Sequence, residues 1–201
     1  SAFVIASYVA KKTSGNSNLD FESALTQFAI LMNERAKEIG VTNTNFVNPH
    51  GYHNGNHYTT AYDLALITRE ALKNPVFREI VKQPLADIGN EASPKQQKLS
   101  FRNRNLLLDS RNTATYYPYA TGIKTGFTDE AGECLVASAT KDGMNLISVL
   151  LYSPSDTRWN ETKALFDYGF ENYQFHQVVN KGDIMGKVYV EKSSPKGPTE
   201  L

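Results

Sequence analysis

The sequence predicts a domain of the mixed α/β class, because helical and strand patterns occupy different parts of the chain. Apolar residues recur at helical spacing between Phe21 and Ile39 and again after Thr60. Two apolar runs with strand character follow, Glu133–Thr140 and Met144–Tyr152, and Lys141-Asp142-Gly143 between them is a hairpin turn signal. A helical pattern then returns from Arg158 to Tyr173. These three observations predict helices combined with a sheet that contains at least one hairpin.

The first ten residues are helical in pattern and mostly apolar. A helix that is apolar on most of its surface needs burial on several sides. A domain rarely starts with such a helix uncovered, so we expect further sequence upstream of Ser1. The polar run Lys11–Asn18 follows, and Ser14-Gly15-Asn16 within it predicts a stop and a loop.

The next helix is expected from Phe21 to Ile39, and Gly40 stands where a C-terminal cap belongs. The segment 43–57 is rich in Asn, His and Gly and predicts a long loop. A third helix starts near Thr60, which with Asp63 resembles a capping arrangement. Pro75 ends this helix or begins another short one.

The end of the chain has a weaker pattern. Gln177–Val190 predicts short strands around Lys181-Gly182-Asp183, and Lys192–Leu201 is rich in Ser, Pro, Gly and Lys, as in a mobile tail. We therefore expect one domain over residues 1–175 and a linker with the start of a second, β-rich unit over residues 176–201.

The composition excludes several classes of protein. The chain has 201 residues, of which 40% are apolar and 21% charged, as in ordinary globular domains. Its 21 Lys and Arg balance 21 Asp and Glu, so we expect no nucleic-acid partner. No apolar stretch approaches the ~20 residues that span a bilayer. Cys134 is the only cysteine, which excludes an internal disulfide, and its apolar strand predicts a buried core thiol.

Lys124-Thr125-Gly126, directly before the first apolar run, is the sharpest local motif. Penicillin-recognising acyl transferases carry Lys-Thr-Gly on a strand beside a serine nucleophile. The cation lies beside the nucleophile, the hydroxyl holds a substrate carboxylate, and the glycine lets the acyl chain lie against the strand edge.

Longer stretches carry a resemblance to one family, the D-alanyl-D-alanine carboxypeptidases, which are low-molecular-mass penicillin-binding proteins of serine peptidase family S11. The similar stretches are Met32–Gly40, Asn43–Gly51, His57–Ala65, Lys124–Gly132 and Leu135–Thr140, and together the resemblance covers roughly residues 1–175. It implies a β-lactamase/transpeptidase-like fold, an antiparallel sheet flanked by helices, followed by a small β-rich C-terminal domain and a membrane-anchoring helix that lies outside this chain.

The resemblance also implies a reaction and its partners. An activated serine attacks the carbonyl between two D-alanines of a peptidoglycan stem pentapeptide, D-alanine leaves, and water hydrolyses the acyl-enzyme. β-Lactam antibiotics inhibit such enzymes, and the substrate places them outside the bacterial cytoplasm. No metal or cofactor takes part.

Matched residue by residue, the resemblance implies roles for six positions. Lys124 would orient groups beside the nucleophile, Thr125 would hold the terminal carboxylate, and Gly126 would leave room for the substrate. The N–H of Phe127 would be one oxyanion donor. Arg158 would lie near the carboxylate and Arg104 would line the cleft floor, although an arginine at either place can also be a solvated surface charge.

The nucleophile of the family lies in Ser-x-x-Lys, where helical spacing brings the lysine against the serine. The chain has two such sequences, Ser138–Lys141 and Ser193–Lys196, of which the first straddles a strand and a turn and the second contains Pro195. Ser14-Gly15-Asn16 has the letters of the family's second motif but stands one helix too late. We therefore expect a fragment that lacks its nucleophile.

Two alternatives remain open at this stage. His50, His53 and His57 could be metal ligands, but Pro49, Gly51 and Gly55 break the element that would hold them rigidly, so a structural loop is favoured. The chain could also be a non-catalytic remnant of the fold that binds peptidoglycan without cleaving it.

Overall fold

The computed structural model describes residues 2–89 and 98–186. The predicted helices and the predicted hairpin occur in the expected order, and a strand pair over Leu85–Gly89 and Lys98–Arg102 was not predicted. The elements are α1 (Ala2–Ser14), α2 (Phe21–Glu38), α3 (Ala61–Ala71), α4 (Pro75–Val81), β1 (Leu85–Gly89), β2 (Lys98–Arg102), the 3₁₀ turn η1 (Leu106–Leu108), β3 (Ala120–Thr128), β4 (Gly132–Lys141), β5 (Met144–Ser153) and α5 (Arg158–Asn172).

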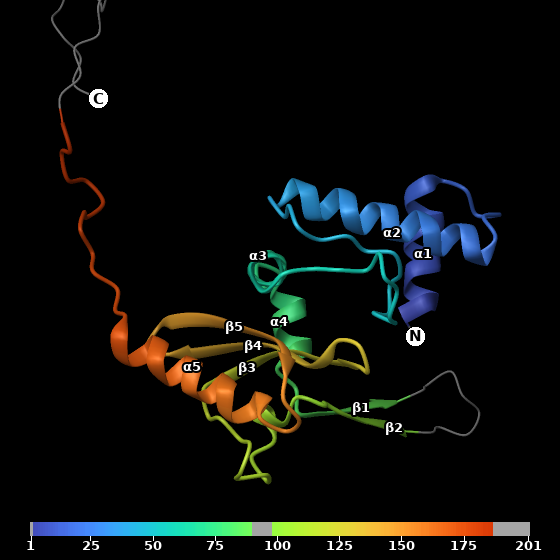
Figure 1. The fold of residues 1–201 in the computed structure, drawn as a ribbon. Coiled ribbons are helices and arrows are strands. Elements are labelled where there is room, and N and C mark those ends of the chain that lie inside the picture. Colours follow the sequence, from blue (N-terminus) through green and yellow to red (C-terminus); the bar gives the residue numbers. More distant parts are fainter. Residues whose placement is uncertain (1, 90–97, 187–201) are drawn as a thin grey trace, which may run out of the picture.

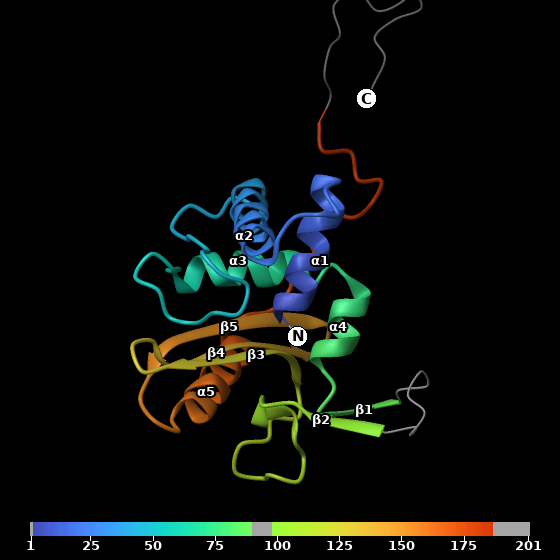
Figure 2. The same cartoon turned by 90° about the vertical axis from the view of Figure 1, so that its right-hand side faces the viewer.

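The centre of the fold is an antiparallel sheet in the order β3-β4-β5. Helix α5 lies on one face of this sheet, and α3 and α4 lie on the other, with α2 farther from the sheet and α1 running from beside α2 toward the sheet (Figures 1 and 2). Strands β1 and β2 form a separate antiparallel hairpin at one side. The expected antiparallel sheet flanked by helices is therefore confirmed.

Local signals explain where the helices begin and end. Asp20 caps α2, because its Oδ1 accepts from Ser23 N at 2.9 Å, and Thr60 caps α3 by accepting from Asp63 N at 3.1 Å. After α2, Gly40 has a φ of +88°, which suits its predicted role as a C-terminal cap. Pro75 begins α4 and does not merely end α3.

The first helix differs from expectation in two ways. It continues through Lys11–Ser14, which the polar composition had assigned to a loop, and ends at Gly15, whose φ is +69°. It buries only Ala6 and Ala10, where its apolar composition predicted burial on several sides. Helix α1 packs on α2, and its apolar residues Val4, Ile5 and Tyr8 remain exposed.

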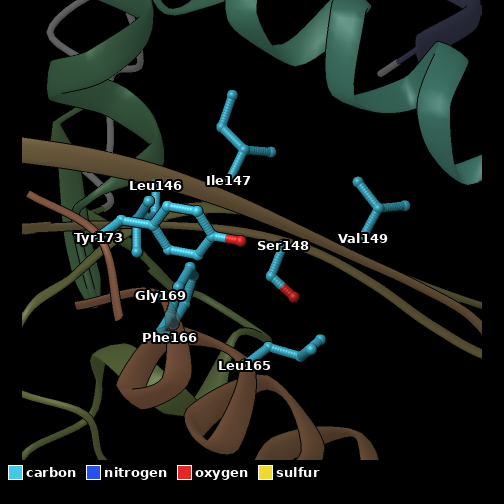
Figure 3. A pocket seen from close by; sticks show the side chains of 8 residues that line it. All are labelled: Leu146, Ile147, Ser148, Val149, Leu165, Phe166, Gly169 and Tyr173. Carbon is cyan, nitrogen blue, oxygen red and sulfur yellow. The ribbon is translucent and has the colours of Figure 1, made fainter. Parts of the chain in front are cut away.

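The β4–β5 hairpin has the predicted turn. Asp142 and Gly143 have φ values of +49° and +80°, the two left-handed positions of a type I′ turn. Side chains alternate along β5: Figure 3 shows Ile147 and Val149 on one side of the strand and Ser148 on the other, toward Leu165 of α5.

The main core lies between the sheet and α5. Its buried members come from η1, the loop before β3, β4 and α5, and they are Leu107, Tyr117, Leu135, Ala137, Ala139, Trp159 and Phe166. This core holds the three strands in fixed register, so it also fixes the position of the Lys-Thr-Gly strand.

After α5, residues 173–186 contain neither helix nor strand. The strands predicted within Gln177–Val190 are therefore wrong for residues 177–186, where the structure has a turn at Lys181-Gly182, and residues 187–190 lie outside the described part. The predicted tail Lys192–Leu201 also lies outside it. Among the described helices, none combines the length and the apolar character that crossing a membrane requires.

Candidate active site

The Lys-Thr-Gly motif lies on β3, which is an edge strand of the central sheet. Lys124 pairs with Val136 of β4, Thr125 with Leu135 and Gly126 with Cys134. Within the described residues, β3 has β4 as its only strand partner, so its other edge has no strand beside it. Such an edge offers backbone N–H and C=O groups to an extended peptide.

The side chain of Lys124 is exposed on this strand, and its Nζ donates to the carbonyl of Thr125 at 2.5 Å. The pKa of Lys124 lies below its ordinary value, first because neighbouring atoms remove part of its water and then because Arg104 and Arg158 are positively charged. The same two arginines are the ones the resemblance selected. The structure thus gathers three cations around the motif, an arrangement that attracts an anionic group.

Arg158 is held firmly at the start of α5. Its side chain is only 14% exposed, and its Nε lies 3.2 Å from Oε2 of Glu133. Its Nη1 donates to the carbonyl of Gly126 at 3.3 Å, and its guanidinium lies 4.7 Å from the ring centroid of Trp159. The reading of Arg158 as a solvated surface charge is therefore wrong, and the residue contacts the motif strand directly.

Arg104 is placed by its two neighbours. The buried Asn105 donates from Nδ2 to the carbonyl of Gly122 at 2.9 Å, which ties this segment to β3. Asn103 donates to the carbonyls of Val81 and Gln83. Arg104 itself is exposed between these anchors, so the segment 103–105 is rigid while its charged member stays accessible.

The remaining motif residues keep the strand edge open. A β-carbon on Gly126 would lie 3.5 Å from Cβ of Cys134, an ordinary contact, so packing within the chain does not require glycine there. The requirement would come from a ligand that approaches the strand. Phe127 is 64% exposed, and Thr125 is half-buried.

Comparisons with known proteins identify the family of the chain. Residues 20–155 match the family model described as D-alanyl-D-alanine carboxypeptidase. The chain is 36% identical over 174 residues to D-alanyl-D-alanine carboxypeptidase DacF of Bacillus subtilis, covering 85% of this chain and 42% of that protein. It is 39% identical over 148 residues to DacC of Escherichia coli, covering 73% of this chain and 34% of that protein.

The chain belongs to the D-alanyl-D-alanine carboxypeptidase family. Its fold matches the crystal structure of the Streptomyces K15 DD-transpeptidase with a TM-score of 0.74 and 30% sequence identity, covering 85% of this chain and 62% of that one. The chain spans less than half the length of the curated relatives it matches.

The family's Ser-x-x-Lys has no working counterpart at Ser138. The hydroxyl of Ser138 is buried and bonded to that of Thr121 at 2.7 Å. The ammonium of Lys141 lies 5.1 Å from the ring centroid of Tyr119 and 5.9 Å from that of Phe170. Lys141 therefore does not serve Ser138 as its base, while the second sequence, Ser193–Lys196, lies outside the described residues.

Ser14 also lacks the surroundings of a family active-site serine. It ends α1, where its hydroxyl donates to the carbonyl of Lys11 and accepts from Asn16 N. The N-terminal end of α1 lies near the central sheet and its other end points away from it (Figure 2). This agrees with the prediction that Ser14-Gly15-Asn16 only has the letters of the family motif.

The three loop histidines have different neighbours. Nδ1 of His57 accepts from Val47 N and Nδ1 of His50 accepts from Tyr52 N, while His53 lies 3.7 Å from a carboxylate oxygen of Glu130. Among residues 2–89 and 98–186, no group of three His, Cys, Asp or Glu side chains is placed to hold a metal ion.

The structure adds two residues that the sequence did not single out, Glu133 and Asn105. Glu133 pairs with Arg158, and Asn105 ties the Arg104 segment to β3. It also corrects Cys134, which is half-buried and donates weakly to the carbonyl of Ala131 at 3.4 Å; it is not a core thiol.

Proposed function

We propose that a protein containing this chain is a serine-type D-alanyl-D-alanine carboxypeptidase, and that this chain forms the wall that binds the substrate's carboxylate. The observation that carries the proposal is the family's Lys-Thr-Gly on an edge strand, where the carbonyl of Gly126 accepts from Arg158 and the charges of Arg104 and Arg158 act on Lys124. A stem peptide ending in D-Ala-D-Ala has the features this wall suits, an extended backbone and a terminal carboxylate.

Each residue then has a defined task. The peptide lies along the open edge of β3, and the hydroxyl of Thr125 donates to the terminal carboxylate, which the positive charges of Lys124, Arg104 and Arg158 attract. Gly126 leaves space for the peptide, and the N–H of Phe127 is one donor to the oxyanion. Glu133 fixes the guanidinium of Arg158 so that it does not need to be ordered when the substrate arrives.

The nucleophile would be a serine of a Ser-x-x-Lys helix that is not among the two such sequences of this chain. Its Oγ attacks the carbonyl between the D-alanines, the lysine takes the Oγ proton, and D-alanine leaves with a proton. Water then releases the shortened peptide and restores the serine. A β-lactam would acylate the same serine. Because peptidoglycan lies outside the cytoplasm, we place the protein on the outer side of the cell membrane.

A second candidate function applies to the chain by itself. Because the hydroxyl of Ser138 is buried and bonded to that of Thr121, and the ammonium of Lys141 lies over the ring of Tyr119, the isolated chain would bind D-Ala-D-Ala without cleaving it. We expect it to form no covalent penicillin adduct, which intact-protein mass spectrometry measures. A mass increase of one opened β-lactam would contradict this expectation, and Ser14 would be the first residue to test.

The catalytic proposal is tested on the longest gene product that contains this sequence. D-Alanine release from a D-Ala-D-Ala peptide should fall by about 10²–10³ in Lys124→Met and Thr125→Val, the effect of removing one preorganised donor. Lys12→Met removes a lysine from the exposed end of α1 and should leave the rate unchanged. Full activity in both motif variants would rule out a role of Lys124 and Thr125 in binding the substrate. A wild-type protein without activity would rule out the proposed carboxypeptidase function.

A further inference from the structure

A cavity of about 560 Å³ lies between the helices and the central sheet, and none of the Lys-Thr-Gly residues lines it. Its walls come from the end of α3 and from α4, and its floor comes from the first residues of β3, the end of β4 and the start of β5. Figures 1 and 2 show α3 and α4 above this face of the sheet. The volume is within the range of small-molecule sites, about 300–1,000 Å³.

The walls carry a strong excess of positive charge. Four cations line the cavity, Arg69, Lys73, Arg78 and Lys82, against one carboxylate, Glu79. The whole chain, by contrast, has 21 basic and 21 acidic residues. A cleft with walls of one sign concentrates ions of the opposite sign.

The ion pairs and hydrogen bonds within the chain use only some of the N–H groups of these four side chains. Lys82 lies 2.8 Å from Glu79, and Lys73 lies 2.6 Å from Glu70, which is outside the cavity. Arg78 uses Nη1 on the carbonyl of Leu72. Among the described residues, Arg69 forms no ion pair of its own, although its charge helps to lower the pKa of Glu70.

The floor offers hydrogen-bond donors as well. Ser138 is 3% exposed, and its hydroxyl lies 2.7 Å from that of Thr121. Two hydroxyls have two protons, and their mutual bond uses one, so the second proton is left to donate. No acceptor for it occurs among residues 2–89 and 98–186. Asn145 accepts from Thr140 through Oδ1 at 2.6 Å, which leaves its Nδ2 protons available.

We propose that this cavity binds the phosphate group of a phosphate ester, at a site separate from the carboxylate wall on β3. A phosphate has several acceptor oxygens and can take the guanidinium fork of Arg69, an ammonium group and floor donors together. The cavity is larger than one phosphate, which suits an ester with an organic part. The inference does not depend on the proposed peptidase activity.

The test titrates sodium pyrophosphate into the ¹⁵N-labelled chain at constant ionic strength. Saturable shifts are expected at the amides of Thr121, Ser138 and Asn145. Arg69→Gln should weaken the affinity about tenfold, the equivalent of one charge-assisted hydrogen bond. Lys12→Gln removes the same charge from α1 and should change the affinity less than about twofold.

Three results would overturn the site: no saturable shifts at the floor, shifts that sodium chloride reproduces, or an unchanged affinity in folded Arg69→Gln. Shifts confined to Lys124 and Arg158 would also overturn it, because they would assign the phosphate to the wall on β3. These outcomes leave the peptidase proposal unaffected.

A second arm distinguishes the sources of the phosphate. Vesicles of phosphatidylglycerol in phosphatidylcholine are mixed with the wild-type chain and with Arg69→Gln, and sedimentation measures the bound protein. Binding that depends on Arg69 would support the site with a lipid headgroup as its ligand. Pyrophosphate binding without vesicle binding would support it with a soluble phosphate compound as its ligand.

Discussion

The two halves of the molecule are stabilised by different kinds of contact. The sheet and α5 enclose large side chains, with Phe166, Leu135 and Leu107 at most 1% exposed. Helices α1 and α2 bury only alanines, and Phe3, Tyr8 and Phe21 remain between 38% and 63% exposed. Buried apolar area is the main source of folding free energy, so the sheet half supplies most of the stability.

In the helical half, hydrogen bonds from side chains contribute a larger part of the contacts that hold the structure together. Asn33 of α2 both donates to the carbonyl of Phe46 at 2.8 Å and accepts from its N–H at 2.7 Å. The buried Asp63 accepts from Asn43 N at 2.8 Å and from the hydroxyl of Thr44 at 2.7 Å. These contacts fix the long loop before α3. The comparison shows that the proposed carboxylate-binding residues of β3 belong to the sheet half, which has its own apolar core.

The largest change in stability is expected from removing a large side chain from the core between the sheet and α5. Phe166→Ala should lower the free energy of unfolding by about 3–5 kcal/mol, because it removes a buried aromatic ring and leaves a cavity. Phe3→Ala, the same substitution on α1, should cost less than about 1 kcal/mol. Urea unfolding followed by circular dichroism measures both. Equal losses would contradict the contrast between the two halves.

A smaller change in stability is expected from removing the hydrogen bonds that Asp63 accepts. Asp63→Ala leaves the N–H of Asn43 and the hydroxyl of Thr44 without their acceptor, at a cost of about 1–3 kcal/mol. Amide hydrogen exchange should speed up in the loop 43–58 and in α3 and stay unchanged in β4. Exchange that speeds up equally in β4 would show that the halves unfold together.

The smallest effect is the pH dependence caused by Lys124. Its pKa is lowered from 10.5 by desolvation and by Arg104 and Arg158, so between the folded pKa and 10.5 the unfolded chain binds more protons. Stability should therefore rise with pH across this window, and Lys124→Met should abolish that rise. NMR titration of the Lys124 Cε should show a midpoint below 10.5 that moves upward in Arg104→Gln. An unshifted midpoint would contradict the gathering of cations.

Much of the fold could be predicted because local rules and tertiary contacts agree. The Asp142-Gly143 turn and the caps at Thr60 and Gly40 depend on neighbouring residues only. The β1–β2 hairpin was missed because its strands are short and exposed: Ile88 is 56% and Leu99 51% accessible, so no alternation between core and solvent marks them.

The sequence predicted those residues of the candidate site that belong to a recognisable motif. Lys124, Thr125 and Gly126 are adjacent, and the family resemblance added Arg104 and Arg158. Glu133 and Asn105 could not be found in this way, since each acts on a residue far away in the sequence, Arg158 and Gly122 respectively. Only the packing of α5 and η1 against the strands brings these partners together.

The most direct measurement is a titration of the ¹⁵N-labelled chain with a peptide that ends in D-Ala-D-Ala. A carboxylate wall on β3 predicts saturable shifts at Lys124, Thr125, Phe127 and Arg158, and an affinity about tenfold lower for the same peptide with an amidated C-terminus. Equal affinity for acid and amide, or shifts that leave β3 unchanged, would contradict the assignment of this strand as the wall that binds the carboxylate.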